Sequence, residues 1–537
     1  LRDRVEGRLY AGLPLSEQCY DNFHSDQCKA IRSGYTNDTF RSQYFGAYMN
    51  TNWETCQADR GDGLDDACLL DRENLWNEDP TFPPRTCRQG SVPYYYIDVR
   101  KPEDVAAAFR YVRNTGTHLV IKNTGHDHMG RSSAPNSLAL WTHNLKHTSY
   151  DLTFVPEGCT TPSPGVTVGA GVQWGEAYDF AEANNITLVG GNDKGVGVAG
   201  GWLQGGGHGG LSNTMGLGVD RVLEFKVVTP DGTYRTVNAC QNQDLFFALR
   251  GGGGGTFGAV LEATMLASPP VPLQVVVLAW VDPDVKLTRT LWKTLVEHGR
   301  RWADEGWGGF VTAESAIYVS PTLSQEDAVA SMRPLLQFGE GLKASGVRGA
   351  TVLKLQFPSW GTFFNTFADE KAATVGTSLA LASRLVPRAN FATPTSRDEL
   401  VEALLRAHDI APGMRLLVSQ PSTFPGVDGA TSVTPAWRDA VYHVTLVRRW
   451  NWNSTQEEKR DAYEGVSSAI EHLRQITPDG VYSNEADVHE PNHEFAFWGE
   501  HCPRLLKIKR KYDPYRLLEC WHCVGWDATS SRYSCYI

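Results

Sequence analysis

Glycine is concentrated in one part of the chain, and this constrains the fold more than any other feature of the sequence. The runs 190–191, 200–210 and 251–255 follow one another closely. Packing alone would not favour this density, because a glycine inside a helix or strand costs roughly 0.5–1 kcal/mol relative to alanine. Main chain without Cβ atoms does allow a ligand to approach closely. We therefore expect the backbone of these runs to lie against a flat group such as a pyrophosphate.

Strand and helix signals begin to alternate near Tyr94, after a polar and cysteine-rich start. From about 270 to 477 the glycine clusters stop, and ordinary helix and strand patterns predict a second domain. Helices are expected at 102–116, 174–183 and 287–302, strands at 94–97, 119–121 and 166–168, and a hairpin at 222–237.

The charge balance excludes two classes of partner. The chain has 50 Lys and Arg against 61 Asp and Glu, so its net charge is -11. An acidic chain lacks the basic surface that binds phosphate backbones or anionic lipids, and we expect neither nucleic acid nor membrane as a partner. No apolar run approaches the roughly 18 residues of a membrane span. A small-molecule partner is left, and the sequence does not address the oligomeric state.

Cysteines and sequons favour the secretory route. Five of the 11 cysteines fall before residue 88, which predicts a disulfide-stapled N-terminal extension, and the odd count leaves at least one thiol unpaired. Glycosylation sequons occur at Asn37, Asn185 and Asn453. The chain opens at Leu1 without an initiator Met or an apolar leader, as a mature secreted chain would. We expect an extracellular glycoprotein with disulfide bonds.

The loop Lys122–Ser133 directly follows a buried-strand signal, where loops often carry ligands. Its small polar residues expose backbone N–H groups, Arg131 can fork onto a phosphate, and His126 offers a nucleophilic imidazole. The alternative is a structural turn with a hydrogen-bonded histidine. His126 and His128 also resemble a pair of metal ligands, but no third ligand is evident nearby, and we expect no metal.

Three other patterns match the letters of known motifs, but the surrounding sequence does not predict the structure that each motif requires. Gly-x-Gly-x-x-Gly occurs at 205–210 and 253–258, but no apolar helix opens at the last glycine, as a Rossmann fold requires. His489–His493 spells a zinc-peptidase motif with Pro491 inside it; a helix would begin at Pro491 and not run through it. Cys520-Trp-His-Cys523 lacks a second Cys pair, so disulfide partners or buried thiols are expected in preference to zinc ligands.

The order of these pieces resembles the vanillyl-alcohol-oxidase superfamily of flavoproteins, and within it the berberine-bridge-enzyme-like branch. The amino-acid sequence of the loop Lys122–Ser133, together with Leu140–His143, is most similar to that of secreted fungal FAD-linked oxidases of the isoamyl-alcohol-oxidase type. The blocks that carry the resemblance are 122–133, 200–210, 217–222 with 229–232, 244–258, and the C-terminal segments 484–487, 497–499 and 509–518.

The resemblance implies an α+β fold: a two-subdomain FAD-binding fold of the vanillyl-alcohol-oxidase type with an antiparallel-sheet substrate domain. The implied segments are a Cys-rich N-terminal extension at 1–88, an FAD-binding domain at 89–270, a substrate domain at 271–480, and a C-terminal return to the FAD domain at 481–537.

The resemblance also implies that His126 is bonded to the flavin 8-methyl carbon. Many members of the branch add a second bond through a Cys just before the glycine block, but 192–198 contains none, so a single link is expected. Trp202 stands where His is common and would narrow the pocket. The other expected cofactor-binding residues are Lys122, Asn123, Thr124, Gly125, Asp127, Gly130, Arg131, Ser132, Gly200, Gly201, Gly205, Gly206, Gly207, Gly209, Val260 and Asn484.

Tyr482 is the expected catalytic base. It precedes Asn484 by two residues, as in the Tyr-x-Asn arrangement that places a phenol at the flavin in this branch. Because a free phenol has a pKa near 10, a neighbour must favour the phenolate, and His208 is the candidate. The alternative is a buried, hydrogen-bonded tyrosine.

The function expected from this resemblance is a secreted FAD oxidase. It would move hydride from an alcohol-type or activated C–H carbon to flavin N5 and reduce O2 to H2O2. Two alternatives stay open: a flavin dehydrogenase that reacts poorly with O2, and a secreted protein that binds flavin without catalysis. A zinc peptidase would instead be colourless and contain metal.

Overall fold

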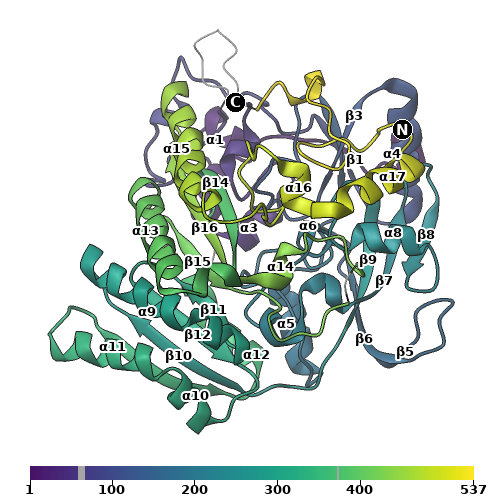
Figure 1. The fold of residues 1–537 in the computed structure, drawn as a ribbon. Coiled ribbons are helices and arrows are strands. Elements are labelled where there is room, and N and C mark those ends of the chain that lie inside the picture. The colour runs from purple at the N-terminus through teal and green to yellow at the C-terminus, as the bar shows by residue number, and fades with distance from the viewer. Residues whose placement is uncertain (58–66, 283, 372–373, 428, 537) are drawn as a thin grey trace.

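Three β-sheets organise the chain in the computed structural model, which describes residues 1–57, 67–282, 284–371, 374–427 and 429–536 (Figure 1). The first sheet has the order β1-β2-β4-β3, with β2, β4 and β3 parallel and β1 antiparallel to β2. Its strands are β1 (Leu9–Ala11), β2 (Tyr95–Asp98), β3 (His118–Lys122) and β4 (Ser137–Trp141). The N-terminal extension therefore supplies an edge strand to this sheet.

Helix α4 (Pro102–Thr115) connects β2 to β3, as the sequence predicts. Pro102 occupies the first turn, where no backbone N–H is needed, and Gly116 ends the helix with a φ of 71°, which glycine adopts without strain. The buried side chains include Val105, Phe109 and Val112, so the apolar stripe faces the sheet. Because β3 is fixed in this way, the loop after Lys122 starts from a rigid strand.

The second sheet is antiparallel, in the order β5-β6-β9-β7-β8. The predicted hairpin is confirmed, since Val228 pairs with Tyr234 across the turn that contains Gly232. Helices α5 (Trp174–Ala183) and α8 (Gln243–Leu249) belong to this part of the chain. The strands are β5 (Thr148–Phe154), β6 (Ser163–Gly169), β7 (Val222–Val228), β8 (Tyr234–Asn238) and β9 (Ala259–Leu266).

The third sheet is the expected antiparallel sheet of the middle segment. Its order is β13-β10-β12-β11-β15-β16-β14, and every neighbouring pair is antiparallel. The strands are β10 (Leu273–Ala279), β11 (Gly308–Val311), β12 (Ser315–Ser320), β13 (Thr351–Phe357), β14 (Ser378–Pro387), β15 (Arg415–Val418) and β16 (Ala440–Trp450). The α+β fold with an antiparallel-sheet second domain is thus confirmed.

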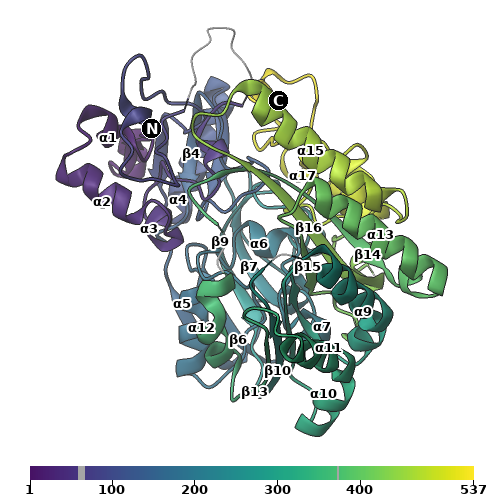
Figure 2. The ribbon, with the colours of Figure 1, turned by 90° about the vertical axis from the view of Figure 1, so that its left-hand side faces the viewer.

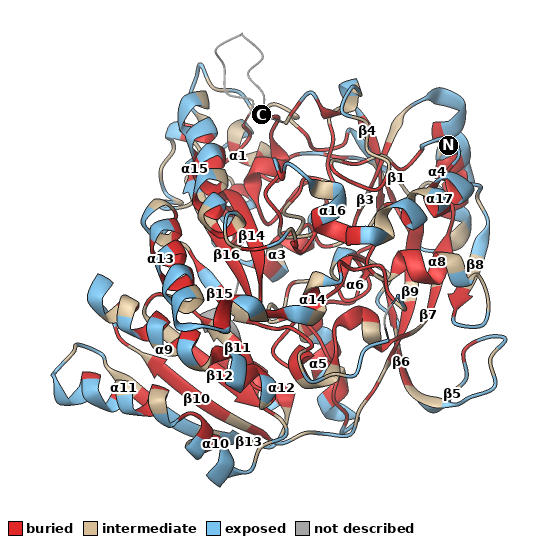
Figure 3. Cartoon of the chain, in the orientation of Figure 1, coloured by how far each residue is buried: buried red, intermediate tan, exposed pale blue. Residues whose placement is uncertain are grey.

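Helices cover the outer face of this sheet (Figure 2). They are α9 (Val285–Asp304), α11 (Arg333–Ala344), α13 (Pro394–Ile410) and α15 (Gln456–Arg474). Their outward sides are exposed and their inward sides buried (Figure 3), as expected for amphipathic helices that bury one apolar stripe. The opposite face of the sheet is consequently free to cover the glycine-rich segment.

The remaining helices are mostly short. They are α1 (Glu17–Asp21), α2 (Asp26–Gly34), α3 (Asp38–Ser42), α6 (Gly201–Gly205), α7 (Ser212–Met215), α10 (Gln325–Ser331), α12 (Trp360–Lys371), α14 (Ala436–Asp439), α16 (His493–Trp498) and α17 (Cys502–Tyr512). The helix expected to begin at Pro491 begins at His493 instead, because Glu490 already closes a turn onto Asp487. His489 lies outside α16, and His493 stacks on His522 with ring centroids 4.0 Å apart.

Disulfides tie the N-terminal extension together and to the other end of the chain. Cys19–Cys28 and Cys68–Cys87 lie within the extension, and Cys56–Cys535 joins it to the C-terminus. Cys159–Cys240 and Cys520–Cys523 are the other two bonds, and Cys502 is a free thiol. The expected stapling and the unpaired cysteine are confirmed, and of the two alternatives for Cys520 and Cys523 the structure shows disulfide bonding, here with each other.

None of the helices in the described part of the chain is long and apolar enough to cross a membrane. The three sequon asparagines, Asn37, Asn185 and Asn453, are exposed.

Candidate active site

A cavity of about 340 Å³ lies where the loop after β3, the glycine runs, the inner face of the third sheet and the C-terminal segment meet. The loop and the glycine runs contribute Asn123, Thr124, Gly125, His126, Asp127, His128, Arg131, Ser132, Gly200, Gly201, Trp202, His208, Gly254, Gly255 and Gly258. The sheets and the C-terminal segment contribute Val260, Leu379, Leu381, Arg415, Leu417, Thr445, Val447, Arg449, Tyr482, Asn484 and Glu485. Residues distant in sequence thus share one site.

Six of the residues expected to bind cofactor lie behind the cavity wall. They are Lys122, Gly130, Gly205, Gly206, Gly207 and Gly209, none of which lines the cavity. A Cβ at Gly209 would lie 1.9 Å from the Gly190 oxygen, and one at Gly205 would lie 2.4 Å from Asn484 Nδ2. These two glycines therefore let the segments behind the wall pack closely.

Lys122 is buried and bonded to the N-terminal extension. Its Nζ donates to the carbonyl oxygens of Phe45 and Ala47, the second at 2.6 Å, and lies over the Tyr48 ring. Burial lowers the pKa of Lys122 to about 7. This residue anchors the start of the loop and presents no charge to the cavity.

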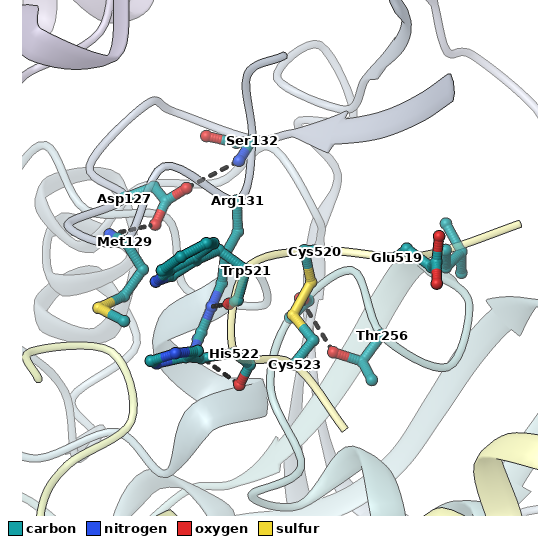
Figure 4. Close-up of a disulfide and its surroundings, with 12 residues drawn as sticks. Asp127, Met129, Arg131, Ser132, Thr256, Glu519, Cys520, Trp521, His522 and Cys523 are labelled. Carbon is teal, nitrogen blue, oxygen red and sulfur yellow. Dashed lines mark hydrogen bonds between the residues drawn. A yellow bond between two sulfur atoms is a disulfide. The ribbon is translucent and has the colours of Figure 1, made fainter. Parts of the chain in front are cut away.

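The loop itself is held by its own carboxylate and by the C-terminal segment (Figure 4). Asp127 accepts hydrogen bonds from the backbone N–H groups of Met129, at 2.9 Å, and Ser132, at 2.7 Å. Arg131 Nε donates to the carbonyl oxygen of Trp521 at 3.1 Å, beside the Cys520–Cys523 disulfide. These contacts within the chain hold the loop in the conformation that lines the cavity.

His126 points a buried nitrogen into a cluster of carboxylates. Its Nε2 has no hydrogen-bond partner among the described residues and lies 3.8 Å from Asp193 Oδ1. Asp38, from the N-terminal extension, completes the group. A Cβ at Gly195 would lie 2.6 Å from Asp38 Oδ2 and 2.8 Å from His126 Nε2, so only glycine leaves room for this group. His128 instead pairs its Nδ1 with Asn50 Nδ2 at 3.0 Å.

Tyr482 lies on the other side of the cavity. Asn484 Nδ2 donates to its hydroxyl oxygen at 2.8 Å, and Gly207 N–H does so at 3.4 Å. Burial, followed by the charge of Glu485, raises the pKa of Tyr482 well above that of a free phenol. The hydroxyl group is therefore protonated at neutral pH, and His208 does not act on it by direct hydrogen bonding but packs edge-on with ring centroids 5.1 Å apart.

Sequence reasoning named His208 but missed the two side chains, Glu485 and His443, that the structure places beside it. His208 Nε2 lies 3.2 Å from Glu485 Oε1, and His443 Nδ1 lies 3.8 Å from Glu485 Oε2. Burial alone would raise the pKa of Glu485, but the charge of His208 and its hydrogen bond, together with His443, lower it to about 2. Burial lowers the pKa of His443 to about 3. Glu485 stood inside a recognised block, yet nothing in the sequence placed β16 beside it.

Two groups among the described residues bring three possible metal ligands together: His208, His443 and Glu485, and Asp38, His126 and Asp193. Both border the cavity, and the pair His126 and His128 does not form such a group. The ligand atoms of each group fall within 4.8 Å of one another. At this distance the side chains of a group could exchange a proton as well as bind a metal.

The carboxylate of Glu485 should contribute to stability in a pH-dependent way. Its pKa is lower in the folded chain than its ordinary 4.5, so its contribution is complete above about pH 4.5 and is lost as the pH falls towards 2. We expect Glu485→Gln to lower the free energy of unfolding by up to about 3 kcal/mol at pH 5.5. In urea titrations, the difference between the two proteins should shrink towards pH 3; a difference independent of pH would contradict this assignment.

The cavity wall fits a flavin dinucleotide. Gly200, Gly201, Gly254 and Gly255 present backbone without side chains, and a Cβ at Gly254 would lie 2.9 Å from the Gly201 Cα. Buried Asn123 Oδ1 has no hydrogen-bond partner among the described residues. A bare backbone surface with unpaired polar atoms is what a large, polar, partly flat cofactor needs.

Comparison with known proteins agrees with this reading. Residues 93–238 match a family model described as an FAD binding domain, and residues 481–520 match one described as berberine and berberine like. The FAD-linked oxidoreductase ffsJ of Aspergillus flavipes is 36% identical over 98% of this chain and 91% of its own length. This chain is an FAD-linked oxidoreductase of the vanillyl-alcohol-oxidase and berberine-bridge-enzyme family.

Two solved structures place this oxidoreductase among its structural neighbours. The VAO-type flavoprotein MtVAO615 of Myceliophthora thermophila C1 has a TM-score of 0.82 and 26% identity, over 99% of this chain and 95% of that one. Glucooligosaccharide oxidase from Acremonium strictum has a TM-score of 0.64 and 21% identity, over 80% and 91% of the two chains, and shows the shared fold alone. The oxidoreductase assignment and the use of FAD expected from the sequence are confirmed.

Proposed function

We propose that this FAD-linked oxidoreductase is a secreted oxidase of alcohols or of compounds with an activated C–H bond. The observation that carries the proposal is the arrangement around one cavity of a buried phenol, an imidazole–carboxylate pair and an unpartnered histidine nitrogen. A bound flavin would supply the hydride acceptor, at N5, for the substrate carbon, and the two electrons would then pass to O2 to give H2O2.

As hydride leaves the substrate carbon, a base must take the proton from the substrate hydroxyl group. Because the pKa of Tyr482 is raised, its phenol stays protonated and donates a hydrogen bond to the substrate oxygen in this proposal; it does not act as the base. His208 Nδ1 is buried without a hydrogen-bond partner among the described residues, while Nε2 faces Glu485. In the proposed mechanism, Nδ1 takes the proton and the anionic Glu485 stabilises the imidazolium, as a carboxylate does for a catalytic histidine in other enzymes.

We propose a single covalent bond between His126 and the flavin 8-methyl carbon. The unpartnered nitrogen of His126 at the cavity and the missing cysteine in 192–198 support it. A 6-S-cysteinyl, 8α-N1-histidyl FAD is named for the oxidase from Acremonium strictum. Segment 192–198 of this chain contains no cysteine that could form the thioether, so one bond is proposed here.

We also propose a separate role for each segment of the chain. In this proposal, FAD is bound by segment 89–270 together with 481–537. The substrate site is covered by segment 271–480, and the loop after β3 is supported by the extension 1–88. Extracellular location and glycosylation are proposed from the five disulfides and the three exposed sequon asparagines.

Aerobic and anaerobic turnover together test the proposal. With a panel of primary and benzylic alcohols, we expect bleaching of the flavin absorbance without O2 and release of one H2O2 per turnover with O2. Bleaching without peroxide would favour the dehydrogenase alternative. A chain that holds flavin but is reduced by no member of the panel would favour a binding protein.

A further inference from the structure

Two arginines stand on the sheet wall of the cavity, Arg415 on β15 and Arg449 on β16. Within the described ranges, neither guanidinium has a hydrogen bond or an ion pair with another residue. Both side chains are exposed, but the surrounding walls lower the pKa of Arg415 by removing water, and partial desolvation and repulsion from Arg415 and Arg72 lower the pKa of Arg449. Both groups stay charged.

Glu485 and Asp193 attract Arg415, and Glu73 attracts Arg449, but the close contacts of these carboxylates are with other residues. Glu485 faces His208 at 3.2 Å, Asp193 faces His126 at 3.8 Å, and Asp127 accepts two backbone N–H groups. Holding two unpaired cations in a partly desolvated wall is costly. An anionic ligand that enters the cavity would offset this cost.

The glycine runs, which suit the pyrophosphate of the cofactor, belong to another wall than these arginines. Arg415 lies directly opposite Thr445, and Leu417 lies opposite His443, so Arg415 is two residues further along the paired strands than the His443–Glu485 contact. Two residues of strand span about 7 Å. Because alternate residues of a strand share a face, Arg415 and Arg449 lie on the sheet face that carries His443, on the side of the cavity where we propose the substrate to react.

Gly413 leaves space for the second arginine. A Cβ at this position would lie 2.5 Å from Val447 Cγ2 and 3.7 Å from Arg449 Nη1, so the absence of a side chain lets Arg449 lie over the end of β15. Leu417 and Val447 line the cavity beside the arginines and give that wall an apolar part.

We propose that the substrate carries a carboxylate, which Arg415 and Arg449 bind at the sheet wall of the cavity, with an apolar spacer between the carboxylate and the reacting carbon. This inference rests on the proposed alcohol oxidation and names its substrate class as hydroxylated carboxylic acids. Guanidinium groups suit the role because they bind carboxylates by two parallel hydrogen bonds.

The experiment compares matched acids and neutral analogues on the flavin-loaded enzyme. The substrates are 4-(hydroxymethyl)benzoate and its methyl ester, and the non-reacting ligands are 4-methylbenzoate and 4-methylbenzamide. We expect kcat/KM for the acid to exceed that for the ester by about 10-fold or more, as a charge-assisted hydrogen bond would give. Arg415→Gln and Arg449→Gln should each remove most of that preference and leave the ester within about 3-fold.

Arg448→Gln is the matched control. Arg448 lies on the same strand, but its Nη1 donates to the carbonyl oxygen of Asp461 on α15, on the helix-covered side. This variant should keep the full preference for the acid. Equal loss in Arg448→Gln and Arg415→Gln would overturn the proposal, because a general change of charge or packing would then explain both.

Calorimetric titration with the non-reacting ligands separates this inference from the proposed function. We expect 4-methylbenzoate to bind the wild-type enzyme at least about 10-fold more tightly than 4-methylbenzamide, and Arg415→Gln to abolish the difference. Equal binding of acid and amide by the wild type would overturn the carboxylate site, even if the ester is oxidised. Preferential binding of the acid without reduction of flavin by any alcohol would support the site and contradict the oxidase.

Discussion

Replacing His126 by alanine is expected to remove the covalent flavin completely. The wild-type tryptic fragment that contains His126 should carry the extra mass of FAD, and the acid-precipitated protein should stay yellow. His126→Ala lacks the imidazole that forms the bond, so its tryptic fragment should be unmodified and the precipitate should be colourless. Mass spectrometry of the fragment and the visible spectrum of the pellet measure the two effects.

His128→Ala is the control for this experiment. His128 lines the same cavity two residues further on, but its Nδ1 is engaged with Asn50 Nδ2. This variant should keep the flavin mass on the fragment. An unmodified fragment from fully flavin-loaded wild-type enzyme would disprove the covalent bond, and loss of the bond in both variants would trace it to the loop conformation rather than to His126.

Tyr482→Phe is expected to slow the reduction of flavin by about 100- to 1,000-fold, the range typical for loss of one hydrogen-bond donor to the reacting oxygen. Phenylalanine keeps the ring contacts to His208 and Trp437, at centroid distances of 5.1 and 5.6 Å, and removes only the hydroxyl group. The rate of bleaching after anaerobic mixing with a substrate of the panel measures the effect. Flavin content should be unchanged, since the hydroxyl group does not touch His126.

Tyr442→Phe provides the comparison. Its hydroxyl is also buried, but it donates to the carbonyl oxygen of Leu295 in the substrate domain at 2.9 Å, away from the cavity. This change should alter the rate by less than about 3-fold. If the flavin of Tyr482→Phe is reduced as fast as that of the wild type, the phenol has a structural role and does not bind the substrate oxygen.

Features that depend on neighbouring residues could be predicted from the sequence. The helix after Pro102 and the hairpin around Gly232 follow from local backbone preferences, and both are present. The loop at His126 and the glycine runs were recognised because their chemistry is carried by contiguous residues. The error at Pro491 was also local: proline suits the first turn of a helix, but the preceding turn delayed the start of α16.

Features that join distant segments were decided only by the tertiary structure. The pairing of Cys56 with Cys535 spans a sequence separation of 479, and no spacing rule identifies it. His208, His443 and Glu485 come from a glycine-rich segment, a strand and the C-terminal segment, and only the fold brings them together.

The class of fold and the cofactor could be inferred from the ordered blocks that resemble a known flavoprotein family, and the glycine-rich loop segments and the first helices from local conformational signals. The tertiary structure decided which polar groups share protons, which residues merely pack behind the wall, and which arginines are left without partners. The physical reason is that pKa values and unpaired charges depend on burial and on distances of a few ångströms between segments, and strand register sets those distances.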